Sequence, residues 1–114
     1  NGIKTDAAFS GKGGEFDLNC YGNGIKAITS VVIDGGKYKI DAKQEGIESG
    51  TSTLANSSAQ LTVKNGEFDI TSTGYAISAT GKVNLSGGKF NLHGGESKIY
   101  AKGSVMTNGA EIIG

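Results

Sequence analysis

The sequence lacks arginine and holds a single cysteine and a single histidine. Its 11 basic residues are all lysine and are balanced by 11 acidic residues, so the formal net charge is zero. A neutral chain without arginine is a poor nucleic-acid binder, because phosphate contacts depend on clustered basic side chains. One cysteine excludes an intrachain disulfide, and it leaves the lone His93 without the ligand set of a zinc site.

Long apolar runs and helical periodicity are also missing. No apolar run approaches the roughly 18 residues of a membrane span, so we expect no membrane insertion. Apolar residues instead alternate with polar ones, as in Ile25 and Ala27 or Tyr38 and Ile40. A spacing of two is typical of strands with one buried face, and it predicts an all-β protein.

What the chain does contain is a repeat of 22 residues. One apolar column marks it at Ile3, Ile25, Ile47, Ile77 and Ile99, with a single longer step of 30 residues. Charged residues recur in the same register, and their signs alternate. These columns are Glu15, Lys37, Glu67, Lys89 and Glu111; Asp17, Lys39, Asp69 and then Asn91; and Lys12, Asp34 and Lys64.

The alternating charges favour one kind of stacking. Parallel stacking places them roughly 4.8 Å apart on adjacent strands, where opposite signs stabilise by roughly 0.2–1 kcal/mol per pair. An antiparallel meander, which Asn65-Gly66 would favour as a hairpin turn, gives no reason for the alternation. We therefore expect a right-handed parallel β-helix, a β-solenoid of about five coils of about 22 residues, with three short strands per coil.

The repeat also sets the expected domain organisation. We expect a single β-helix domain over residues 1–114, with coils at 1–22, 23–44, 45–74, 75–96 and 97–114. The polar stretch near 51–59 breaks the period and predicts a loop inserted in the third coil. Both ends fall inside a repeat without a visible cap, so we expect a fragment of a longer chain, with neighbouring domains or coils as partners.

Residues outside the charge ladders are the candidates for function. Exposed tyrosine rings stack on the apolar faces of sugars, and Glu45 and Glu48 are the best acidic pair. These residues converge on the Gly-Ile strand, beside the insertion. The predicted ligand-binding residues are Asn23, Lys26, Glu45, Glu48, Tyr75 and Tyr100, and no residue is predicted to be catalytic.

The repeat resembles a known family. Gly46-Ile47-Glu48-Ser49, an apolar strand, and then Gly35-Gly36-Lys37-Tyr38 or Asn65-Gly66-Glu67-Phe68 are similar to secreted bacterial right-handed β-helix proteins. These are carbohydrate-binding domain-containing proteins of a pectate-lyase-like fold. The resemblance implies polygalacturonate-type ligands, and calcium as a cofactor, for which Glu45 and Glu48 are the metal ligands to test.

Three functions are compatible with these observations. We favour a non-catalytic carbohydrate-binding module, extracellular or at the cell surface, that recognises an extended polysaccharide, acidic ones included, on the β-helix surface. The alternative is a structural repeat or adhesin stalk. A polysaccharide lyase or hydrolase is the third reading, and we expect no enzyme because the paired carboxylates and the arginine of such sites are missing.

Overall fold

The computed structural model describes residues 2–5, 7–50, 59–95, 98–107 and 109–113. These residues form 13 strands in two sheets. The strands are β1 (Ile3–Thr5), β2 (Ala8–Gly11), β3 (Glu15–Cys20), β4 (Ile25–Ala27), β5 (Ser30–Ala42), β6 (Ile47–Ser49), β7 (Gln60–Ser72), β8 (Ile77–Ala79), β9 (Val83–Leu85), β10 (Lys89–Gly94), β11 (Ile99–Ala101), β12 (Val105–Met106) and β13 (Glu111–Ile113).

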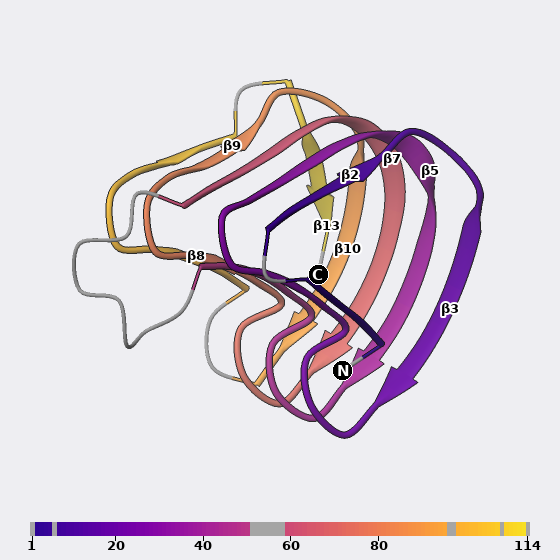
Figure 1. Ribbon diagram of the computed structural model, residues 1–114. Coiled ribbons are helices and arrows are strands. Elements are labelled where there is room, and N and C mark those ends of the chain that lie inside the picture. The colour runs from indigo at the N-terminus through magenta and orange to yellow at the C-terminus, as the bar shows by residue number, and fades with distance from the viewer. Residues whose placement is uncertain (1, 6, 51–58, 96–97, 108, 114) are drawn as a thin grey trace.

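All strand pairs of both sheets are parallel. The smaller sheet has five strands in the order β1-β4-β6-β8-β11. The larger sheet has eight: β12-β9-β7-β10-β13 form one path, and β5 pairs with β2, β3 and β7. Figure 1 shows β3, β5, β7 and β10 side by side along one flank. Among the described residues no helix has the length and apolarity that a membrane span requires.

The predicted right-handed β-solenoid of five coils with three short strands each is wrong. The strands form two parallel sheets of five and eight strands in a compact molecule of 31 × 30 × 25 Å. The second and third expected strands of residues 23–44 are a single 13-residue strand, β5, and β7 has the same length. The physical reason lies in the glycines, because Gly35 and Gly36 take positive φ and carry the chain through a bend without ending the strand.

The pairing register itself is confirmed for most columns. Ile3, Ile25, Ile47, Ile77 and Ile99 pair in that order, as do the charged columns that contain Lys37 and Lys39. The column of Lys12, Asp34 and Lys64 is wrong in part, since a register shift at the bend pairs Asp34 with Asn65. The stretch expected as an inserted loop lies outside the described residues except for Ala59, which is buried.

One core lies between the inner faces of the two sheets. The isoleucines of the five-stranded sheet are fully buried at positions 25, 47 and 77. On the larger sheet the rings of Phe16, Tyr38, Phe68 and Phe90 stack with centroids 4.6–4.9 Å apart and planes within 6°. Burial of one face of each strand makes the register obligatory, because a slip of one residue would turn every apolar side chain outward.

Candidate functional site

The six predicted site residues all lie at the five-stranded sheet. Lys26 is the middle residue of β4, Glu48 of β6 and Tyr100 of β11, and each points away from the core because its two strand neighbours point inward. Asn23, Glu45 and Tyr75 precede β4, β6 and β8 by two residues. The strand pairing thus sets these side chains in two adjacent columns on one surface, which we call the small-sheet face.

A polar network orders the Lys26 end of this face. The Lys26 Nζ lies 3.0 Å from Glu48 Oε1, and the two side chains are only 23% and 15% exposed. The buried Asn23 donates from Nδ2 to the same carboxylate oxygen at 3.2 Å and accepts the Glu45 backbone N–H at 3.0 Å through Oδ1. Because the amide bridges two repeats, it fixes the Glu45 turn relative to the Glu48 carboxylate.

A tyrosine pair forms the other end of the face. The rings of Tyr75 and Tyr100 have centroids 4.8 Å apart and lie 14° from parallel. Tyr100 is 43% exposed, whereas Tyr75 is half-buried. The pair therefore presents an aromatic surface to solvent while each ring holds the other in place.

A cavity of about 150 Å³ lies between the two ends. It is lined by Glu45, Glu48, Ser49, Tyr75, Ser78, Ala79, Thr80 and Tyr100. Four of these residues were predicted from the sequence. Ser78 was missed, although it lies in the column of Lys26, Glu48 and Tyr100 and alignment of that column would have found it.

Gly74 is a second contributor that the sequence reasoning missed. A Cβ at this position would clash with Glu45 Oε2, so the absence of a side chain leaves room for the carboxylate. Gly74 itself is buried, and its backbone N–H donates to the Gln44 carbonyl at 3.0 Å. The glycine therefore belongs to the site through the space that it leaves open.

Calcium finds little support in this geometry. In the part of the chain that the structure describes, no three His, Cys, Asp or Glu side chains gather into a metal-binding group. Lys26 and Asn23 already occupy an oxygen of Glu48, whereas calcium takes six to eight oxygen ligands. The role of Glu45 and Glu48 as calcium ligands stays a prediction.

The larger sheet carries wider depressions. A groove of about 680 Å³ crosses the outer faces of β3, β5, β7 and β10 between rows of charged side chains. A second one, of about 740 Å³, lies over the neighbouring turn glycines, among them Gly36, Gly66 and Gly88. The alternating charges on this face predict pairing between neighbouring strands, so the sequence indicates no binding site here.

Comparison with known proteins identifies the family. A family described as "Carbohydrate-binding domain-containing protein" matches residues 1–112, so the chain belongs to that family. Comparisons with curated proteins and with solved structures give no significant match.

Proposed function

We propose, from membership of this carbohydrate-binding domain-containing family, that the chain is a non-catalytic module that binds an extended polysaccharide on the small-sheet face. The observation that carries the proposal is the Tyr75–Tyr100 ring pair beside the carboxylates of Glu45 and Glu48, around one cavity. We place its action outside the cell or at the cell surface, where such polymers occur.

Each part of the face suits a different part of a sugar. A tyrosine ring packs against the apolar C–H face of a pyranose, and its hydroxyl provides one further hydrogen bond. The carboxylates accept hydrogen bonds from sugar hydroxyls, and charge makes such bonds stronger than neutral ones. Because Lys26 and Asn23 hold Glu48 in advance, its ordering costs little at the moment of binding.

The size of the cavity limits the affinity. At about 150 Å³ it is smaller than the roughly 300–1,000 Å³ of closed ligand pockets, so it takes part of one sugar unit. The remaining units of a polymer lie across the open sheet. Modest affinity per unit, multiplied along a polymer, is the binding mode that this surface favours.

The lysines at the other end of the face extend the proposal to acidic polymers. Lys4 pairs with Lys26 in register, and Lys4 is exposed. Lys26 pairs with Glu48, whereas Lys4 lies one strand further from that carboxylate, so a sugar carboxylate would supply negative charge beside Lys4. A uronic acid at this end and a ring over the tyrosines would bind simultaneously.

A screen of immobilised polysaccharides, followed by titration calorimetry with the best ligand, tests the proposal. The double variant Tyr75→Ala/Tyr100→Ala should lose about tenfold or more in affinity, since two stacking contacts disappear. Tyr21→Ala is the matched control, because this tyrosine is 90% exposed and does not line the cavity. Undiminished binding by the double variant would move the site elsewhere, and a parent that binds no glycan would favour the stalk.

Catalysis is tested separately. The purified protein should release no new reducing ends and no unsaturated products from the polysaccharide that it binds. Either product would overturn the non-catalytic assignment without affecting the location of the site.

A further inference from the structure

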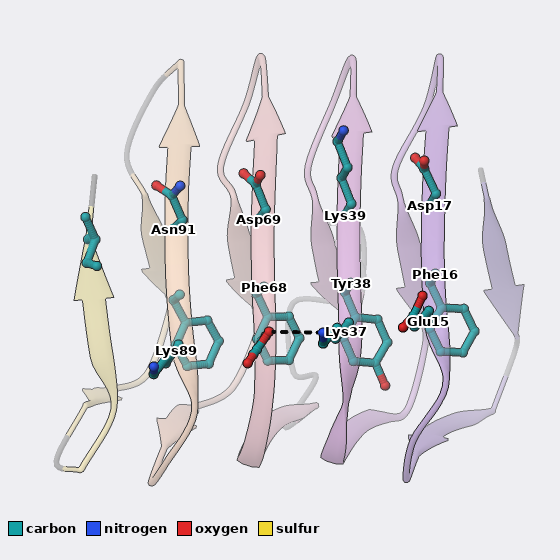
Figure 2. A pocket seen from close by; sticks show the side chains of 13 residues that line it. Glu15, Phe16, Asp17, Lys37, Tyr38, Lys39, Phe68, Asp69, Lys89 and Asn91 are labelled. Atoms are coloured by element: carbon teal, nitrogen blue, oxygen red, sulfur yellow. Dashed lines mark ion pairs between the residues drawn. The ribbon is translucent and has the colours of Figure 1, made fainter.

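The outer face of the larger sheet carries two rows of side chains with a groove between them (Figure 2). One row is formed by Glu15, Lys37, Glu67 and Lys89, and the other by Asp17, Lys39, Asp69 and Asn91. The groove of about 680 Å³ runs across the strands, over the column of stacked rings. We call this surface the ladder groove.

The charge in the ladder groove changes sign from strand to strand. The strand β3 presents Glu15 and Asp17, and β5 presents Lys37 and Lys39. The strand β7 is negative again, with Glu67 and Asp69, and β10 presents Lys89 beside the neutral Asn91. A linear ligand that crosses the strands therefore meets the same sign on both walls at β3, β5 and β7, and a single positive wall at β10. The sign reverses from each strand to the next.

The strand register places these charged side chains at fixed positions, but most of them form no ion pair with one another among the described residues. Among the described residues the only ion pair within the rows is Lys37–Glu67, at 4.0 Å. Its side chains are 65% and 59% exposed, so the interaction is weak. The Lys26–Glu48 pair on the other sheet is shorter by 1.0 Å and far less exposed. The ladder groove thus keeps solvent-exposed ammonium and carboxylate groups at regular spacing.

We propose that the ladder groove binds a linear polysaccharide in which acidic and neutral sugars alternate. Strands lie roughly 4.8 Å apart, close to the length that one pyranose adds to an extended glycan. A carboxylate on every second sugar then meets the lysines of β5 and β10, two strand spacings apart. The neutral sugar between them donates hydroxyl or amide hydrogens to Glu67 and Asp69 of β7.

Other polymers fit this pattern less well. A uniformly acidic polysaccharide would bring every second carboxylate against Glu67 and Asp69, where like charges repel. An extended peptide repeats its side chains on one face about every 7 Å, out of step with strands spaced about 4.8 Å. The inference takes the class of ligand from the proposed function but uses a different sheet, so the two can fail independently.

The test compares three oligosaccharides of equal length by titration calorimetry. The probes are an alternating glucuronate–N-acetylglucosamine oligosaccharide, an oligogalacturonate and a neutral cello-oligosaccharide. We expect the alternating probe to bind most tightly, and to weaken as salt rises because its carboxylates contact exposed lysines. Equal or tighter binding of the oligogalacturonate by the Tyr75→Ala/Tyr100→Ala variant, in which the small-sheet face lacks its ring pair, would overturn the inference.

Removing lysine charges from the ladder groove tests whether the alternating oligosaccharide binds there. Lys37→Gln/Lys89→Gln should weaken binding of the alternating probe about tenfold, since two charge-assisted contacts disappear. Lys43→Gln/Lys82→Gln is the matched control, with two exposed lysines that lie outside the groove. If the first variant binds like the parent while Tyr75→Ala/Tyr100→Ala does not, the ligand lies on the small-sheet face. That outcome would overturn the ladder-groove site and support the proposed function.

Charge reversal tests the specificity. Glu67→Lys/Asp69→Lys makes β5, β7 and β10 positive in succession, and the preference should shift from the alternating probe toward the oligogalacturonate. Thermal melting of each variant checks that the fold persists, which the exposure of these side chains favours. If the folded variant kept its preference for the alternating probe, the alternating charges would not select the ligand, and the inference would be wrong.

Discussion

The outer faces of the two sheets both carry lysine and glutamate one strand apart, but in different surroundings. On the small-sheet face, Lys26 and Glu48 meet at 3.0 Å, largely shielded from water, and the Asn23 amide shares the carboxylate. On the larger sheet, Lys37 and Glu67 stand 4.0 Å apart in solvent. Shielding and a third polar partner hold the Glu48 carboxylate in place, while the exposed Lys37 and Glu67 interact only weakly with each other.

The two faces share one core, so a cavity in that core should destabilise both of them. Ile47 is fully buried between Ile25 and Ile77, so Ile47→Ala should lower the free energy of unfolding by roughly 2–5 kcal/mol. Urea titration measures the change. Ile3→Ala, in the same column but only half-buried, is the control and should cost less. Equal losses of unfolding free energy at the two positions would contradict the tighter packing of Ile47 in the core.

The second-largest effect is expected for Glu48→Ala, compared with the equivalent change on the larger sheet. Removing this carboxylate leaves the largely shielded Lys26 and the buried Asn23 amide without their common acceptor, at a cost of about 1–2 kcal/mol in unfolding free energy. The matched change on the other face, Glu67→Ala, should cost less than about 0.5 kcal/mol because its pair is exposed. Thermal melts at low salt test both. Similar losses would contradict the contrast between shielded and exposed pairs.

Charge reversal on the larger sheet should have a smaller effect that depends on salt. Lys37→Glu places three carboxylates in succession in one column, between Glu15 and Glu67. We expect a loss of about 0.5–1 kcal/mol at low ionic strength from the new repulsion. Moderate salt should restore most of the stability by screening, because these groups are in solvent. A loss that persists in high salt would mean that the position is shielded.

The smallest effect concerns Tyr38, below the ladder groove. Burial raises the pKa of its phenol above the ordinary 10.0, and its hydroxyl donates to the Gly35 carbonyl at 3.1 Å. Tyr38→Phe should cost about 0.5 kcal/mol near neutral pH, because Phe16 and Phe68 show that the stack accepts a plain ring.

The stability difference between the parent and Tyr38→Phe should depend on pH. A raised pKa in the folded state means that the neutral phenol stabilises the fold below pH 10, and that this stability is lost as the pH rises further. The parent should therefore lose its advantage over Tyr38→Phe above pH 10. Paired melts across that range measure the difference, and a constant gap would contradict it.

Much of the arrangement of the small-sheet face was predictable, because register follows from a repeat. Residues 22 apart with alternating polarity can bury their apolar faces only if equivalent positions pair, so Lys26, Glu48 and Tyr100 had to share one outer column. The contribution of Gly74 was not predictable in this way, since it depends on the space above a turn rather than on periodicity.

The sequence by itself determined which residues pair in most columns, which side chains face the core, and where charge alternates beside the stacked rings, because a strand turns its side chains with a period of two. Only the tertiary structure decided how the strands join into sheets. The positive φ of Gly35 and Gly36 let β5 continue through a bend where three separate strands per coil were expected, and this produced sheets of five and eight strands. It also decided that Lys26 and Glu48 meet while the ladder charges stay apart, because distance and shielding depend on side chains packed from several layers at once.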